Sequence, residues 1–93
     1  MNVQHTDTSE GGAFYLEQGG THVAELTYRR RDDGVVVADH TFTDPSLRGQ
    51  GTAGQLLAAF MAWVEQQKLR VVPQCSYVAR AFDKNPAYAQ FRA

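Results

Sequence analysis

A glycine-rich segment in the middle of the chain holds the residues whose spacing points most directly to chemistry. Residues 47–51 read LRGQG, and a helical pattern begins just after them and includes Gly54. The first N–H groups of a helix have no intrahelical partner, and the helix dipole adds partial positive charge there. Glycines let a ligand approach the backbone closely, and Arg48 adds a fixed positive charge. The segment therefore predicts a binding site for a phosphate-like anion.

Two common phosphate-binding motifs do not fit this segment. No Gly-Lys-Ser/Thr follows the glycines, which excludes a P-loop. The segment also matches the dinucleotide-binding motif poorly, because Gly49 and Gly51 do not follow a buried parallel strand at the start of the chain. The loop is instead set off from the preceding residues by Asp44-Pro45, because proline cannot continue a central strand.

Period-two patterning predicts the strands that must position this loop. Residues 13–17 are a short apolar stretch, residues 21–29 alternate strictly, and residues 35–43 are rich in valine and threonine. Glycine-containing turns separate them at residues 18–20 and 31–34. We therefore expect three antiparallel strands in a meander.

Helical spacing dominates the chain after the loop. An apolar stripe through residues 51–67 predicts a helix packed on the sheet. Residues 69–76 predict a short strand that pairs in parallel through a right-handed crossover. Residues 77–84 predict a short helix that Asn85-Pro86 ends, with one more turn after it. The expected fold is α+β, with three antiparallel strands, the helix after the loop, a parallel fourth strand and a short C-terminal helix.

Length and composition limit the other possibilities. The 93 residues suit one domain, and we expect residues 1–12 to be a flexible tail and residues 13–93 to fold. A net charge of −1 argues against a nucleic-acid binder. No apolar run reaches the roughly 18–20 residues that span a bilayer, and the polar start is no signal peptide, so we expect a cytoplasmic protein. One cysteine and three scattered histidines predict no metal site.

The loop and its surroundings resemble the GNAT N-acetyltransferase superfamily. Residues 48–53 (RGQGTA) resemble its signature, Arg/Gln-x-x-Gly-x-Gly/Ala, in the same context of a strand, a proline and an amphipathic helix. Seven residues further along the chain resemble the small single-domain branch of this superfamily, the minimal acetyltransferases. They are Pro73, Cys75, Tyr77, Val78, Asn85, Pro86 and Tyr88. The resemblance covers residues 13–91. It implies a GNAT-like mixed sheet and transfer of an acetyl group from acetyl-CoA to an amine, while the amine and the oligomeric state remain open.

The resemblance also implies which residues hold coenzyme A. The loop amides would bind its pyrophosphate, and the backbone at the end of the preceding strand would pair with the pantetheine arm like an added strand. Asn85 would contact the coenzyme arm, although Asn-Pro is also a good helix stop. The expected coenzyme-binding residues are Phe42, Thr43, Arg48, Gly49, Gln50, Gly51, Thr52, Ala53, Gly54 and Asn85.

His40 and Cys75 are the two candidate catalytic residues. The alternation places His40 on the same strand face as Ala38 and Phe42, either as a hydrogen-bonded core residue or as the group that takes a proton from the acceptor. Cys75 is either a small buried hydrophobe or a nucleophile with His40 as its base. The resemblance implies a Cys/His pair near the thioester, so transfer is either direct or passes through Cys75.

Two other function classes stay open at this point. Full-sized GNAT enzymes have further helices after the first strand and further strands that shape the acceptor site, and we do not expect those helices here, because residues 18–21 are too few to form them. A coenzyme A-binding module without catalysis would keep its affinity when His40 and Cys75 are replaced. A small protein-interaction domain would use the loop only as a turn.

Overall fold

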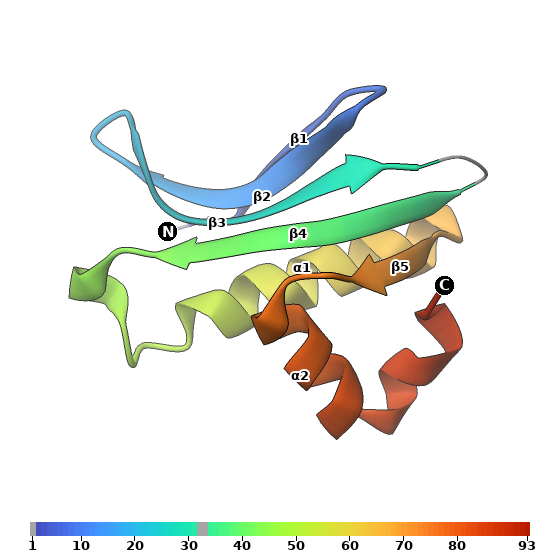
Figure 1. Ribbon diagram of the computed structural model, residues 1–93. Helices are drawn as coiled ribbons and strands as arrows, with labels where there is room; N and C mark the ends of the chain where they lie inside the picture. The colour runs from blue at the N-terminus through green and yellow to red at the C-terminus, as the bar shows by residue number, and fades with distance from the viewer. Residues whose placement is uncertain (1, 32–33) are drawn as a thin grey trace.

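The computed structural model describes residues 2–31 and 34–93, which form one five-stranded sheet and its covering helices (Figure 1). The strands follow their chain order across the sheet; the first four pair antiparallel, and the fifth pairs parallel to the fourth. The elements are β1 (Gln4–Asp7), β2 (Gly11–Gln18), β3 (Thr21–Arg30), β4 (Val35–Thr43), the 3-10 helix η1 (Pro45–Leu47), α1 (Thr52–Gln67), β5 (Arg70–Pro73), α2 (Ser76–Lys84) and the 3-10 helix η2 (Pro86–Phe91).

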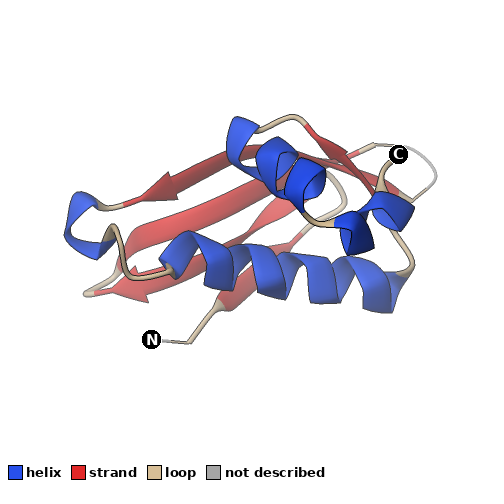
Figure 2. Cartoon of the chain, turned by 90° about the horizontal axis from the view of Figure 1, so that it is seen from below, coloured by secondary structure: helices blue, strands red, loops and turns tan. Residues whose placement is uncertain are grey.

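The two α-helices cover the same face of the sheet. Figure 2 looks onto that face and shows α1 and α2 lying across the strands. Val78 and Phe82 of α2 join the core that α1 makes with the sheet. In Figure 1 no drawn element covers the opposite face, so the described part of the chain has a helix-covered face and an uncovered face.

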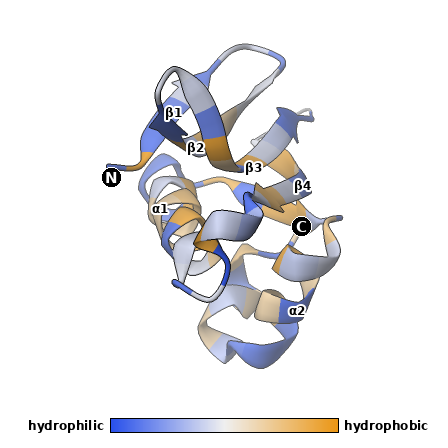
Figure 3. Cartoon of the chain, turned by 90° about the vertical axis from the view of Figure 1, so that its left-hand side faces the viewer, coloured by the Kyte–Doolittle hydropathy of each residue, from blue (hydrophilic) through white to orange (hydrophobic). Residues whose placement is uncertain are grey.

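The core forms where the helical and strand periodicities meet. Leu26 and Tyr28 of β3 and Leu56, Phe60 and Val64 of α1 are buried. In Figure 3 the ribbon has the orange of hydrophobic residues at several places along the strands and α1. Burying one such aliphatic or aromatic side chain contributes about 1.5–3 kcal/mol. This contact holds α1, and therefore the loop before it, at a fixed place on the sheet.

Most of the expected elements are confirmed. The α+β fold is present, α1 begins one residue after the expected start, and β5 pairs in parallel with β4 after the α1 crossover. The turn expected at residues 31–34 includes residues 32–33, which lie outside the described residues. No helix in the described ranges is long and apolar enough to cross a membrane.

The first strand, β1, lies within the residues expected to be a tail. Gln4–Asp7 pairs antiparallel with β2, so the expectation of a flexible tail is wrong there, and the sheet has four antiparallel strands instead of three. Every residue of β1 is exposed, and no apolar alternation could reveal it. The strand is held by its side chains: the His5 ring stacks on Phe14 with 3.9 Å between ring centroids, and the Tyr28 hydroxyl donates to Asp7 Oδ1 at 2.7 Å.

Charge reinforces this attachment of β1. Arg30 Nη2 donates to Asp7 Oδ2 at 2.7 Å, and this side-chain hydrogen bond is the main cause that lowers the pKa of Asp7. Burial first, and then the hydrogen bond to Asp7, raise the pKa of Tyr28 far above its ordinary value. Because the Tyr28 hydroxyl donates its hydrogen to Asp7, its oxygen is the acceptor in the second hydrogen bond, in which His5 Nε2 is the donor at 2.8 Å. Tyr28 therefore links the buried face of β3 to β1.

A β-bulge in β4 changes which of its side chains face the helices. Tyr28 pairs with Ala38 and Thr27 pairs with His40, which leaves Asp39 as the extra residue. Thr27 points away from the core, and so does His40 opposite it. The expectation that His40 shares a face with Ala38 is therefore wrong, because a bulge interrupts the period-two alternation.

We predict that Tyr28→Phe lowers the free energy of unfolding by about 1 kcal/mol, because it removes a part-buried hydroxyl with two partners. The amide protons of β1 should then exchange faster than those of β3. The measurements are urea denaturation and hydrogen exchange. Tyr15→Phe is the matched control, since Tyr15 lies on the neighbouring strand and faces away from the core. Equal losses in the two variants would contradict the proposed attachment of β1.

Candidate functional site

The loop between β4 and α1 is fixed at its start by Asp44. The Ser46 N–H and the Ser46 hydroxyl both donate to Asp44 Oδ1, at 2.9 and 2.7 Å, and the backbone bond is the main cause that lowers the pKa of Asp44. The Asp44 N–H donates to the carbonyl oxygen of Val23 on β3 at 2.8 Å. Gln50 Nε2 then donates to the Ser46 carbonyl oxygen at 3.2 Å. These bonds tie the loop to the sheet.

Gly49 and Gly51 give the loop its shape. Both have left-handed backbones, with φ of 81° and 73°, which residues with a side chain rarely adopt. A Cβ added at either position would meet no atom within 4 Å, so open space lies in front of the backbone. Gly51 is the N-cap of α1, and no side chain caps the helix there. The first N–H groups of α1 therefore keep their capacity to bind an anion.

A cavity of about 310 Å³ lies against this helix start. Its lining joins the end of β4, the loop, the first turn of α1 and one residue of α2: Thr43, Leu47, Arg48, Gly49, Gly51, Thr52, Ala53, Gly54 and Tyr77. Most of the expected coenzyme-binding residues are therefore brought together. Within residues 2–31 and 34–93 no cluster of metal-ligating side chains occurs.

Three residues of the expected set do not line this cavity. Phe42 lies on the uncovered face of the sheet with 42% of its surface exposed, and Gln50 braces the loop from outside. Asn85 lies beyond α2, where its Oδ1 accepts from the Ala87 N–H at 3.1 Å and starts η2. A coenzyme contact of these three residues stays a prediction.

A gap opens between β4 and β5 next to the cavity. The two strands pair only from Val35 to Ala38 of β4, and the last bond on that side runs from the Cys75 N–H to the Ala38 carbonyl oxygen at 2.8 Å. The chain then turns into α2, while β4 continues to Thr43. Among the described strands none pairs with this last part of β4 on the β5 side. Its backbone groups there are free to pair with an extended ligand.

Cys75 lies in this gap, at the N-cap of α2. Its Sγ is 3.4 Å from Thr41 Oγ1. Burial alone raises the pKa of the thiol, but hydrogen bonds from Thr41 and from the backbone N–H groups of Val78 and Tyr77 bring the pKa below its ordinary value. A helix start stabilises a thiolate in the same way that it binds any anion. The gap therefore contains a polarised sulfur on the helix-covered side of the sheet.

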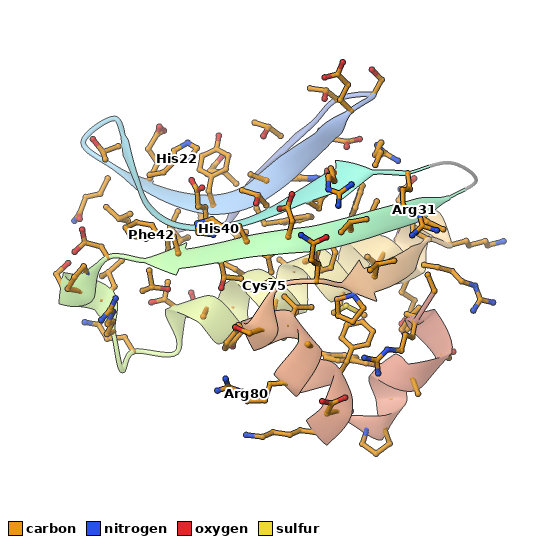
Figure 4. All side chains as sticks on the ribbon, in the orientation of Figure 1. His22, Arg31, His40, Phe42, Cys75 and Arg80 are labelled. Carbon is orange, nitrogen blue, oxygen red and sulfur yellow. The ribbon has the colours of Figure 1, made fainter. Side chains whose placement is uncertain are left out.

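His40 lies on the other side of the sheet from Cys75. Figure 4 shows His40 on the uncovered side of β4 and Cys75 on the helix-covered side. The register agrees, because Thr41 faces the core opposite Leu26, whereas His40 pairs with the outward-facing Thr27. The structure therefore does not bring the expected pair into contact, and it is Thr41 that contacts the thiol.

Asp39 is the residue that the sequence patterns did not reveal. Thr27 Oγ1 donates to Asp39 Oδ1 at 2.6 Å, and the Arg29 guanidinium lies 3.9 Å from Oδ2. The same guanidinium donates to Gln74 Oε1 at 3.0 Å, next to Cys75 in the chain. A bulge places neighbouring side chains on one face. Asp39 and His40 consequently lie together on the uncovered face, beside the gap.

Comparison with known proteins gives one family and several structural relatives. The sequence profile of the GCN5-related N-acetyl-transferase family matches residues 13–91. No curated protein matches the chain. A GCN5-like protein from Staphylococcus aureus, named as a candidate N-acetyltransferase, has a solution structure with a TM-score of 0.75 and 26% identity, over 99% of this chain and 89% of that one.

Two structures of the aminoglycoside N-acetyltransferase AAC(6′)-Iy share the fold. The complex with CoA has a TM-score of 0.58 and 21% identity, over 83% of this chain and 67% of that one. The complex with a bisubstrate analogue, CoA-S-monomethyl-acetylneamine, has a TM-score of 0.57 and 22% identity, over 83% and 61%. At this identity the likeness concerns the fold alone.

We predict that Thr41→Val raises the pKa of the Cys75 thiol, because the substitution removes a hydrogen-bonding group from the sulfur. Less thiolate is then present at neutral pH, and alkylation by iodoacetamide slows. The measurement is the alkylation rate as a function of pH. Thr43→Val is the control, since Thr43 lies on the same face of β4 one pleat further from the sulfur. A curve for Thr41→Val that overlies the unmodified protein's would disprove the contact.

Proposed function

We propose that this chain, which belongs to the GCN5-related N-acetyltransferase family, transfers an acetyl group from acetyl-CoA to an amine. One observation carries the proposal: a glycine-lined cavity lies against the uncapped N-terminus of α1, and its lining includes Thr43, in the part of β4 that β5 does not pair with. An anion site joined to an open strand edge suits a ligand with a phosphate at one end and an extended amide-containing arm.

The residues of the cavity fit the pyrophosphate of coenzyme A. The N–H groups of Thr52, Ala53 and Gly54 belong to the first turn of α1, where intrahelical partners are lacking. Arg48 adds a cation at the cavity mouth. The open space in front of Gly49 and Gly51 is the space that a phosphate would occupy. The proposed contacts with the pyrophosphate are therefore made mainly by backbone N–H groups, whose positions do not depend on side-chain conformation.

The free edge of β4 would hold the pantetheine arm. In this proposal the backbone of Phe42 and Thr43 pairs with the amides of the arm in the manner of an added strand. The arm then runs along β4 toward Cys75 and Thr41, which places the thioester in the gap. Backbone N–H groups of β4 on that edge would polarise the thioester carbonyl, as in an oxyanion hole.

The amine would approach from the uncovered face, where Asp39 and His40 lie. The Asp39 carboxylate attracts the acceptor as an ammonium ion, and His40 takes one proton from it. The nitrogen then forms a bond to the acetyl carbon and releases its second proton, the carbon–sulfur bond breaks, and coenzyme A leaves as a thiol with that proton. Acetyl-CoA supplies the activated acetyl group in this reaction.

The geometry favours direct transfer over an acetyl group carried on Cys75. The sheet separates His40 from the thiol, so His40 does not deprotonate it. An amine arriving beside His40 and a thioester lying beside Cys75 meet within the gap itself. Cys75 and Thr41 then serve to position the thioester.

We predict that Gly51→Trp weakens the binding of acetyl-CoA by at least about tenfold, because an indole fills the space in front of the helix start and the left-handed backbone is strained. Gly19→Trp is a matched control: Gly19 also has a left-handed backbone and open space, but it lies in the β2–β3 turn. The measurement is calorimetric titration. Failure of the unmodified protein to bind acetyl-CoA would end the acetyltransferase proposal.

We predict that His40→Gln lowers kcat by about a hundredfold and leaves the Kd for acetyl-CoA unchanged, because His40 acts on the acceptor side only. The measurement is release of free thiol with a panel of amine acceptors, including peptide N-termini and lysine side chains. Cys75→Ser should retain turnover. Mass spectrometry that finds an acetyl group on Cys75 during turnover would refute direct transfer, and an unchanged kcat in His40→Gln would remove the proposed role of His40.

A further inference from the structure

A second cavity of about 240 Å³ lies on α2 beside the first one. It is lined by Tyr77, Arg80, Ala81 and Lys84, which recur at helical spacing along one side of α2. Tyr77 also lines the cavity at the start of α1, so the two hollows share a wall. The two cavities are therefore neighbours that meet at Tyr77.

The second cavity carries two positive charges. Arg80 and Lys84 are exposed and lie one helical turn apart, so their side chains rise from the same side of α2. Within residues 2–31 and 34–93, neither side chain has an ion pair or a side-chain hydrogen bond. In Figure 4 Arg80 extends outward from α2. Like charges at this spacing repel, which an anion bound between them would relieve.

The two arginines of β3, in contrast, lie close to carboxylates of the chain. Arg30 pairs with Asp7 at 2.7 Å, and Arg29 lies against Asp39. On α2 itself, the one acidic residue, Asp83, lies 3.6 Å from Arg92 and not from Arg80 or Lys84. Within the described residues, the charges of Arg80 and Lys84 are therefore not paired with a carboxylate.

We propose that Arg80 and Lys84 bind the 3′-phosphate of the adenosine end of coenzyme A; the inference rests on the proposed function. With the pyrophosphate at the start of α1 and the pantetheine arm along β4, the nucleotide is the part of the ligand that leaves the first cavity outward. Its ribose phosphate is a dianion that needs cations nearby, and the hollow across Tyr77 supplies them. Arginine and lysine are the side chains that bind phosphate best.

This site would give the protein selectivity for its donor. A donor without the 3′-phosphate keeps every contact in the first cavity and loses only those to Arg80 and Lys84. The loop and the α2 pair therefore make separable contributions: the loop recognises any pyrophosphate-linked pantetheine, and the pair selects coenzyme A among such molecules.

The experiment compares the Kd of coenzyme A with that of 3′-dephospho-coenzyme A by calorimetry. We expect the unmodified protein to bind coenzyme A about tenfold more tightly than 3′-dephospho-coenzyme A at low salt. This is the effect of two charge-assisted contacts that are weakened because Arg80 and Lys84 are exposed to solvent. In the double variant Arg80→Gln with Lys84→Gln, coenzyme A should bind about tenfold more weakly and 3′-dephospho-coenzyme A should bind as before. The preference should also shrink as salt is added.

Two variants control for general charge and for the loop. Arg31→Gln changes the net charge equally but lies at the opposite end of β4 from the loop (Figure 4), so the preference should survive it. Arg48→Ala should weaken both compounds by the same factor. Equal affinity of the unmodified protein for the two compounds, or an equal loss for both in the double variant, would overturn this inference alone. No binding of either compound would overturn it together with the proposed function.

Discussion

The extra residue in β4 is the constraint on which the rest of the candidate site depends. Asp39 interrupts the alternation of the strand, so that Val36 and Ala38 face the helices before it and Thr41 and Thr43 face them after it. The pairing of β4 with β5 ends at Ala38, just before the bulge. A bulge bends its strand and increases its twist, which separates β4 from a straight neighbour. The gap, the free edge and the position of His40 all follow from this one insertion.

A second constraint acts after the end of β4, where the loop leads into α1. A helix whose first turn is exposed normally has a side-chain cap, because its first N–H groups otherwise lack partners. Here the N-cap is Gly51, which offers no side chain, and the preceding loop is braced by Asp44 and Gln50. The loop is therefore held by groups that stay away from the helix start. The N-terminus of α1 therefore lacks a side-chain cap, and the stability of the helix comes from its buried residues.

The sequence predicted the parts of this fold that follow from regular patterns. The residues of β4 and the end of α1 are as expected, because a nine-residue run rich in valine and threonine and an apolar stripe over four turns are strong signals. The loop was predicted from glycine and arginine, whose effects are local. These features also place most of the expected coenzyme-binding residues around one cavity.

The features that were missed depend on contacts between distant residues. β1 is polar throughout and is stabilised through Tyr28, which lies 21 residues beyond Asp7 in the sequence. The bulge at Asp39 has no signature in the amino-acid composition of β4. This one extra residue made the sequence-based prediction of the face of His40 wrong. Cys75 was expected to meet a histidine, but its partners are a threonine on β4 and the N–H groups of its own helix. Patterns within a strand identify an element, whereas the face that a side chain occupies depends on its register with the neighbouring strand.

The uncovered face of the sheet offers the proposed reaction a second side from which a substrate can approach. In a layered fold a ligand reaches the centre through a cleft between elements, and such clefts need additional helices to form their walls. Here the proposed meeting point of the substrates is the region beyond Ala38, where β5 no longer pairs with β4. In the proposed reaction acetyl-CoA would lie on the helix-covered side, where the N-terminus of α1 complements its charge, and the amine would approach the uncovered side beside Asp39 and His40. Because the two proposed binding sites lie on different faces of the sheet, neither needs space within the small core, and the core residues can hold α1 against β3 and β4.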